Sequence, residues 1–370
     1  MIGRRVLGVV LAVSSVGVTA CSSSDDETTR SSATIPTTAP ASGVTTTGVP
    51  TSVAATTGAP PTTAGPVTST TPVPTTAAPT TAGPTSAAPT TIVVHTTLPV
   101  AAPTVLSIVD RSRPTSAAGG DTGSDVRTIV TDVYLPNYET DPDPKPLIVL
   151  AHGFTGHPDK FTQLASAWAA AGFVVAVPKF PLTNNEVVSP QLGDLAEQGA
   201  DVDVVIDELL DRNTSRSDVL AGTIDPERIG LYGLSLGSLT VWGTLVDGCC
   251  RNRIDALVQS DGAFPGDASL LADVRIPVMI AHSDTDAIFP IAGIRAEYRA
   301  LRAPKYFLTL HGFAHAVVGE NTPTTADDAY IVATTVFWRR HLLGATADSH
   351  DGTFPDMVTV DGITSLASRE

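Results

Sequence analysis

The chain has 370 residues and a formal net charge of -16, because 38 acidic side chains outnumber 22 basic ones. So acidic a composition argues against nucleic-acid binding, which needs basic groups to displace counterions from phosphates. Besides Cys21, the cysteines are the neighbours Cys249 and Cys250, which excludes a disulfide framework across the fold. We expect two thiols there, with a strained vicinal disulfide as the alternative.

The first 20 residues have the three regions of a secretory signal. Arg4 and Arg5 are followed by an apolar stretch at residues 6–13 and then by small residues before Cys21. The stretch Val-Thr-Ala-Cys at residues 18–21 resembles a bacterial lipobox, which implies cleavage before Cys21 and lipidation of that residue. An ordinary signal peptide with an incidental cysteine is the alternative. Both interpretations predict export, and the first predicts a secreted protein anchored by lipid to the outer face of the cell membrane.

Residues 21–104 have the composition of an extended stalk. No Asp, Glu, Lys or Arg occurs between residues 31 and 109, where Thr, Pro, Ala, Ser and Gly recur without helical or strand periodicity. Large apolar side chains are too few to offset the entropy lost on folding. We therefore predict a disordered stalk that leads to a folded domain at residues 105–344, with a C-terminal tail at residues 345–370.

The folded domain begins with two predicted strands at residues 105–109 and 127–135, which have the pattern of an antiparallel hairpin. Continuous apolar runs then predict strands buried on both faces of a sheet, and amphipathic stretches between them predict helices. The further predicted strands are residues 147–151, 173–177, 228–232, 254–259, 276–281 and 306–310. The predicted helices are residues 161–171, 192–210, 236–246, 291–301 and 330–343. This alternation predicts an α/β fold with a mostly parallel sheet and helices on both faces.

The pentapeptide Gly-Leu-Ser-Leu-Gly at residues 233–237 lies between a predicted strand and a predicted helix. In that context the G-x-S-x-G motif forms a sharp turn, the nucleophile elbow, which presents the serine hydroxyl at the helix N-terminus. Its glycines are needed where a side chain would collide with the neighbouring strand and helix. The motif therefore predicts an α/β-hydrolase fold with Ser235 as the nucleophile.

A serine hydroxyl needs a base, and in α/β-hydrolases the order along the chain is serine, acid, histidine. Asp286 and His315 follow Ser235 in that order, and each comes just after a predicted strand. We therefore predict His315 as the base and Asp286 as the acid that orients it. His311, which is nearer its strand, is a rival base. Asp261, which follows the preceding strand, is the alternative acid.

Two backbone N–H groups are expected to stabilise the oxyanion of the tetrahedral intermediate. The elbow supplies the N–H of Leu236, and the loop after the strand at residues 147–151 supplies that of Phe154. His152 and His157 lie in the same loop, but no further cluster of His, Cys or Glu completes a zinc site with them. We therefore expect His152 to be structural, and we expect neither a metal nor a cofactor.

Several segments between residues 104 and 343 make the chain resemble a group of secreted α/β-hydrolases. These segments are residues 110–114, 152–156, 172–175, 233–237, 284–290 and 312–315. The group includes cutinase-like polyester hydrolases and proteins similar to platelet-activating-factor acetylhydrolase and chlorophyllase. The resemblance to the first implies Asp286 as the acid, and that to the second implies Asp261. Polyester hydrolases usually carry a Trp-His pair after the strand that precedes Asp261, and this chain lacks it.

These features predict a serine hydrolase that cleaves carboxylic esters outside the cytoplasm through an acyl-enzyme. Few residues separate the predicted strands at 254–259 and 276–281, so we expect an open cleft without a large lid. The expected apolar walls are Phe154, Leu236, Phe264, Ile288 and Phe289. An acyltransferase with the same triad and a non-catalytic surface-binding protein are the alternatives. We expect a monomer whose partners are a small or polymeric ester and the membrane that holds its anchor.

Overall fold

The computed structural model describes residues 102–118, 122–139, 141–247, 251–302, 304–344 and 359–369. The predicted signal at residues 1–20, Cys21 and the predicted stalk up to residue 101 lie outside the described residues. So do Cys249, Cys250 and residues 345–358 of the predicted tail. What the sequence predicts for these segments stays a prediction.

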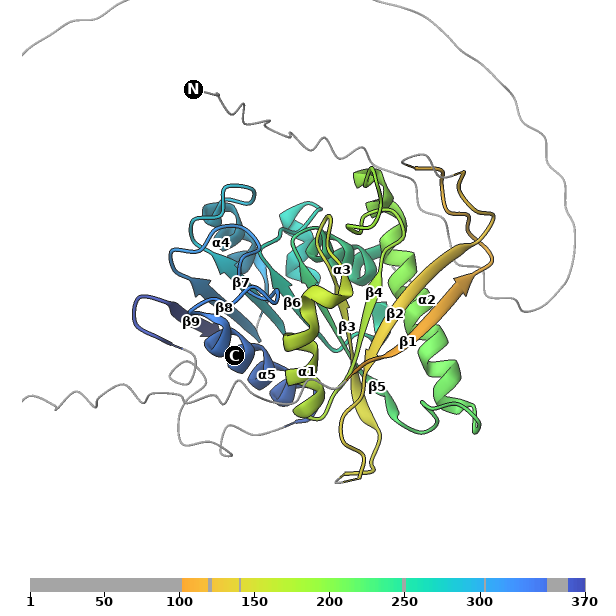
Figure 1. Ribbon diagram of the computed structural model, residues 1–370. Coiled ribbons are helices and arrows are strands. Elements are labelled where there is room, and N and C mark those ends of the chain that lie inside the picture. Colours follow the sequence, from red (N-terminus) through yellow and green to blue (C-terminus); the bar gives the residue numbers. More distant parts are fainter. Residues whose placement is uncertain are drawn as a thin grey trace, which may run out of the picture. The chain divides into compact units, whose positions relative to one another are not determined.

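Strands and helices alternate along most of the described chain (Figure 1). The strands are β1 (Thr104–Asp110), β2 (Arg127–Tyr134), β3 (Lys145–Ala151), β4 (Val174–Lys179), β5 (Ile224–Leu234), β6 (Ala256–Ser260), β7 (Val278–Ser283), β8 (Lys305–Leu310) and β9 (Thr364–Arg369). The α-helices are α1 (Thr162–Ala170), α2 (Leu195–Thr214), α3 (Leu236–Asp247), α4 (Ile291–Ala300) and α5 (Asp327–Leu342). Short 3-10 helices are η1 (Pro158–Phe161), η2 (Leu192–Asp194), η3 (Arg251–Arg253) and η4 (Ala268–Asp273). Every predicted strand and helix is present, with ends that differ by a few residues.

The strands form one nine-stranded sheet in the order β1-β2-β4-β3-β5-β6-β7-β8-β9. Strands β3 to β8 pair in parallel, whereas β1, β2 and β9 make antiparallel pairs toward the two edges. The antiparallel hairpin and the mostly parallel sheet are thus confirmed. Because β4 and β5 lie on opposite sides of β3, the loops after β3 and β5 diverge at the carboxyl edge of the sheet. Ligands of open α/β sheets commonly bind at such a point.

The sheet separates two hydrophobic cores, because successive side chains of a strand point to opposite faces. In β3, Leu147 and Val149 belong to the core that α2, α3 and α4 complete, whereas Ile148 and Leu150 belong to the core that α1 and α5 complete. Figure 1 shows α1 and α5 in front of the sheet and α2 and α3 behind it. Burial on both faces explains the continuous apolar run of β3.

A buried ion network attaches the hairpin of β1 and β2 to α2. The Arg127 guanidinium donates two hydrogen bonds to Asp194 (2.9 and 2.8 Å) and two to Asp201 (both 2.6 Å). Arg113 extends the network by donating to Asp110 at 2.6 Å and to Asp201 at 2.8 Å. The segment at residues 110–114 therefore has a structural role, since it ties the edge of the sheet to a covering helix.

Within the predicted C-terminal tail at residues 345–370, Thr364–Arg369 forms strand β9, for which the sequence pattern predicts no strand. This strand pairs antiparallel with β8, from Thr364 opposite Leu310 to Arg369 opposite Lys305. Thr364 is buried and the other residues of β9 are at least partly exposed, so the apolar alternation that predicts a strand is weak. Hydrogen bonding to the edge of β8 determines its conformation instead.

The described residues contain neither a large lid nor a membrane-spanning helix. Residues 261–277, which connect β6 to β7, include η4 as their helical element, and it is six residues long. The expectation of no large insertion at this position is therefore met. Among the described helices, none is both long and apolar enough to cross a membrane.

Candidate active site

Ser235 occupies the turn between β5 and α3 in a strained backbone conformation. Its φ of 54° lies in the left-handed region, which is uncommon for a residue with a side chain. A Cβ at Gly233 would lie 2.2 Å from the carbonyl oxygen of Gly237, and one at Gly237 would lie 2.0 Å from that of Ala151. Both positions therefore require glycine. The Ser235 N–H also donates to the Ser260 carbonyl at 2.9 Å, which ties the turn to β6.

We expect Gly237→Ala to prevent the elbow from forming, because the clashing atom belongs to the backbone of β3 and cannot move without breaking the sheet. Gly243→Ala is the matched control, since nothing lies within 4 Å of a Cβ added there in α3. Alanine is the better helix former by up to about 1 kcal/mol, so this control should be neutral or stabilising. Soluble yield and thermal unfolding of the two full-length variants test this. An unfolding temperature for Gly237→Ala equal to that of the wild type would contradict the packing at the turn.

The structure brings Ser235, His315 and Asp286 together from the ends of three different strands. Ser235 Oγ lies 2.7 Å from Nε2 of His315, and Nδ1 of His315 lies 2.8 Å from Oδ2 of Asp286. An ionised carboxylate can only accept hydrogen bonds, so Nδ1 carries the proton and Nε2 accepts from the serine hydroxyl. With this tautomer, the imidazole is oriented to receive the Ser235 proton.

Asp286 is held by the backbone of its own loop. Its Oδ1 accepts the N–H groups of Ile288 at 2.7 Å and Phe289 at 2.9 Å, which leaves Oδ2 for His315. The ring of Phe289 also packs beside the His315 imidazole, with 5.7 Å between ring centroids. The Asp286 side chain is 0% exposed and that of His315 is 22% exposed. The carboxylate is therefore sealed from water, while part of the imidazole remains accessible.

Asp261, the alternative acid, lies near the triad but binds other groups. Its Oδ1 accepts the N–H of Ser283 at 2.6 Å, and its Oδ2 accepts the Ser283 hydroxyl at 2.8 Å and the N–H of Ala316 at 2.9 Å. It therefore contacts the loop of His315 through the backbone of the following residue, while the imidazole itself is bound to Asp286. Both Asp261 and Ala316 have positive φ, 38° and 55°, so the two loops are tightly bent where they meet.

His311, the rival base, is engaged on both ring nitrogens. Its Nδ1 lies 3.0 Å from Oδ2 of Asp284, and its Nε2 lies 2.8 Å from Oγ of Ser365 on β9. His311 therefore links the loop after β8 to the edge strand β9. Among the histidines that the described residues contain, His315 is the one within hydrogen-bond distance of Ser235.

Of the two residues predicted to form the oxyanion hole, one adjoins Ser235 in the chain and the other follows a residue that lies close to it. Leu236 follows the serine directly and is the first residue of α3. On the other side, a Cβ added to Gly153, the residue before Phe154, would lie 3.7 Å from Ser235 Oγ. Within the described residues, neither the Phe154 N–H nor the Leu236 N–H donates to a backbone carbonyl.

His152 supports the loop of Phe154 from inside the protein. Its Nε2 accepts the N–H of Phe180 at 3.1 Å, so its Nδ1 carries the proton and donates to the Gly153 carbonyl at 2.8 Å. Burial lowers the pKa of His152 to about 4, which keeps the ring neutral near pH 7. The N–H of Thr155 also donates to the loop after β4, at the Thr183 carbonyl, 2.7 Å away. The loop is thus fixed on both sides of Phe154.

The apolar residues predicted as pocket walls differ in exposure. Ile288 is 61% exposed and Phe154 is 40% exposed, whereas Leu236 and Phe264 are buried. The ring of Phe264 packs edge-on against Trp242, with 5.2 Å between centroids, so it contributes chiefly to the core. Of the predicted wall residues, the accessible ones are therefore Phe154, Ile288 and the half-buried Phe289.

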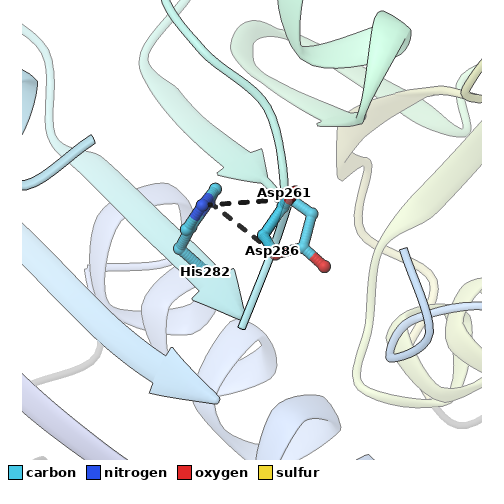
Figure 2. A group of neighbouring side chains, drawn as sticks. All are labelled: Asp261, His282 and Asp286. Atoms are coloured by element: carbon cyan, nitrogen blue, oxygen red, sulfur yellow. Dashed lines mark ion pairs between the residues drawn. The ribbon is translucent and has the colours of Figure 1, made fainter. Parts of the chain in front are cut away.

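A buried histidine that the sequence does not single out, His282, lies beside Asp286. Figure 2 shows its ring beside the carboxyl groups of Asp261 and Asp286. Its Nδ1 is 3.7 Å from Oδ1 of Asp261, and its Nε2 is 3.7 Å from Oδ2 of Asp286. One donor atom from each residue lies within 4.8 Å of the others, so the three could hold a metal ion. The signal that identifies His282 is its position at the carboxyl end of a buried strand, one strand after Asp261.

A serine on a strained strand-turn-helix bend, followed along the chain by an acid and a histidine at later strand ends, defines an α/β-hydrolase. The nine-stranded, mostly parallel sheet belongs to the same class, so the predicted fold is confirmed. The chain belongs to the dienelactone hydrolase family, whose sequence profile matches residues 132–342, more than half of the chain. Family membership supports a hydrolase. A search of curated proteins finds no match.

Proposed function

We propose that this hydrolase cleaves carboxylic esters through an acyl-enzyme on Ser235, with His315 as general base and Asp286 as the acid that orients it. The observation that carries the proposal is the continuous path of hydrogen bonds, 2.7 Å from Ser235 Oγ to His315 Nε2 and 2.8 Å from His315 Nδ1 to Asp286. Each proton-transfer partner is already within reach, so the chemistry needs no rearrangement of the triad.

In the proposed first half-reaction, Ser235 Oγ attacks the ester carbonyl carbon while His315 Nε2 takes the hydroxyl proton. The carbonyl oxygen becomes an oxyanion, which the N–H groups of Leu236 and Phe154 stabilise. When the intermediate collapses, the bond to the alcohol oxygen breaks and the imidazolium returns its proton to that oxygen. Water then attacks the acyl-enzyme with the same base, which releases the carboxylic acid and restores Ser235.

The ester class is supported by the family and by the surroundings of the serine. A lactone is a cyclic carboxylic ester, so the family name is consistent with ester cleavage. The accessible groups Phe154, Ile288 and Phe289 offer apolar contacts to an acyl or alkyl chain. The connection between β6 and β7 contains no large lid, so both a small and a polymeric ester can approach.

The proposed location is extracytoplasmic, with the catalytic domain held near the membrane by a lipid on Cys21 and by the stalk. The residues that support this are the charged, apolar and small-residue regions of the leader and the Val-Thr-Ala-Cys sequence at residues 18–21. We propose that the catalytic domain acts as a monomer without a metal or cofactor and that it does not bind nucleic acid. Its acidic composition supports the last point.

A panel of p-nitrophenyl esters with acyl chains of increasing length tests the function on the full chain. We expect turnover with a preference for short or medium chains, and an acyl adduct on the peptide that contains Ser235 when the reaction is quenched in acid. The p-nitroanilide of the best acyl group is the control and should turn over much more slowly. Product analysis with an added alcohol distinguishes hydrolysis from acyl transfer. The absence of both turnover and adduct across the panel would reject the proposal.

A further inference from the structure

The buried pair of Asp261 and His282 places two hydrogen-bond acceptors opposite each other. The His282 Nε2–H donates to the Phe289 carbonyl at 2.7 Å, so in the neutral ring Nδ1 is the unprotonated nitrogen. Among the described residues, Nδ1 has no hydrogen-bond partner, and it faces Oδ1 of Asp261 at 3.7 Å. Both side chains are 0% exposed. A lone pair facing an ionised carboxylate in a dry site is unfavourable unless a proton lies between them.

The surrounding contacts fix this geometry. Asp261 receives three donors, from the N–H and hydroxyl of Ser283 and from the N–H of Ala316, so its carboxyl group cannot turn away. His282 is fixed by the Phe289 carbonyl, in the loop whose N–H groups hold Asp286. The pair thus connects both loops that bear on the imidazole of His315, one through Phe289 and the other through Ala316.

We propose that the pair of Asp261 and His282 together holds one buried proton, called the shared proton below, and that the pair acts as positioning residues for the loops of Asp286 and His315. The shared proton follows from the facing acceptors alone. The positioning role concerns ester hydrolysis and therefore rests on the function proposed above.

A metal ion is the other occupant that this cluster suggests, since the donor atoms of Asp261, His282 and Asp286 lie within 4.8 Å of one another. However, all four carboxylate oxygens already take part in hydrogen bonds, three to backbone N–H groups or Ser283 and one to His315. A metal would compete with these bonds and would withdraw Asp286 from the imidazole. A proton leaves every one of them in place, so the donor set favours the proton.

The other titratable groups near the pair come from three elements. Asp286 faces His282 from the loop after β7 through Oδ2, the oxygen that also binds His315. Tyr232 on β5 and Tyr330 on α5 interact with Asp261, and burial raises the pKa of both phenols, so they stay neutral. Burial also raises the pKa of Asp261, which is consistent with a proton retained at this carboxyl group. With that proton, Asp286 is the one uncompensated charge of the cluster facing His315.

Nitrogen-15 spectra of the full chain labelled at histidine test the shared proton without any activity measurement. We expect Nδ1 of His282 to lack the resonance of a free, unprotonated imidazole nitrogen at pH 7. In Asp261→Asn, where the shared proton has no acid to hold it, that resonance should appear. His152 is the internal control, because it is buried and neutral in both proteins. His282→Gln assigns the signals.

Two results would overturn the shared proton. One is a free, unprotonated Nδ1 of His282 in the wild type that Asp261→Asn leaves unchanged. The other is a displacement of the His282 signals by zinc chloride at stoichiometric concentration, reversed by a chelator, which would assign the cluster to a metal.

The pH profile of kcat/KM tests the positioning role. In His282→Gln the new amide can donate an N–H to Asp261 in place of the facing acceptor, which favours the ionised carboxylate, so more negative charge faces His315 and favours the protonated imidazole. We expect the acid limb of the profile to move to higher pH by about one unit, with kcat reduced about tenfold or more and KM little changed. Asp261→Asn keeps the pair neutral, so its acid limb should stay in place. Identical shifts in the two variants, with the spectra as predicted, would reject the positioning role and leave the shared proton standing.

Discussion

Ser235→Ala should lower kcat/KM for the best p-nitrophenyl ester by roughly 10⁴-fold to 10⁶-fold, the range expected for removal of a serine nucleophile. Without the serine oxygen no protein atom remains to attack the ester carbonyl carbon, so the base and the oxyanion donors cannot contribute to acylation. His315 Nε2 loses the partner at 2.7 Å, whereas the Asp286 contact at 2.8 Å remains. The substitution removes one oxygen from a turn whose shape depends on glycines, so the fold should be retained.

The measurement combines steady-state kinetics with covalent labelling by a fluorophosphonate. Wild type should take up one label, on the peptide containing Ser235, and Ser235→Ala should take up none. Ser107→Ala is the control, because Ser107 lies exposed on β1, far along the sheet from β5. It should label and turn over like the wild type. Label on another residue of Ser235→Ala, or activity within tenfold of wild type, would remove Ser235 from the role of nucleophile.

The order of the elements is predictable from the sequence because local patterns carry it. Strand β3 is a continuous apolar run since it is buried on both faces, and the elbow agrees with the strand before it and the helix after it. By contrast, β9 has an exposed pattern because it pairs only with the edge of β8. Arg127 lies on a strand and is buried only because Asp194 and Asp201 arrive from residues far along the chain. Such long-range contacts cannot be predicted from the local pattern of apolar and polar residues.

Local sequence patterns are also insufficient to choose between Asp261 and Asp286 as the acid that orients His315. Asp261 and Asp286 both follow buried strands, so strand ends alone favour neither. The two carboxylates differ in the groups that donate hydrogen bonds to them. The N–H groups of Ile288 and Phe289 occupy Oδ1 of Asp286 and leave Oδ2 for the imidazole. Ser283, the residue after His282, occupies Asp261 instead. Loop conformation decides between them, and it cannot be deduced from residue type and order.

Asp286→Asn should therefore reduce kcat about 10³-fold to 10⁴-fold with little change in KM. The amide introduced by this substitution would keep the N–H groups of Ile288 and Phe289 on its carbonyl oxygen, which directs its NH₂ group toward Nδ1 of His315. Two donors cannot face each other, so the imidazole proton moves to Nε2. That nitrogen then faces Ser235 as a donor and no longer accepts the hydroxyl proton.

Asp261→Asn is the matched comparison, because it makes the same change in a carboxyl group just as deeply buried. It disturbs the hydrogen bond from Ala316 but leaves the contact between His315 and Asp286 intact, so we expect a loss of only about tenfold. Steady-state kinetics of both variants on one ester, with circular dichroism to verify folding, decide between the acids. If Asp261→Asn loses as much kcat as Asp286→Asn, or more, the acid assigned to this triad is incorrect, because the 2.8 Å contact at His315 would then not govern the tautomer.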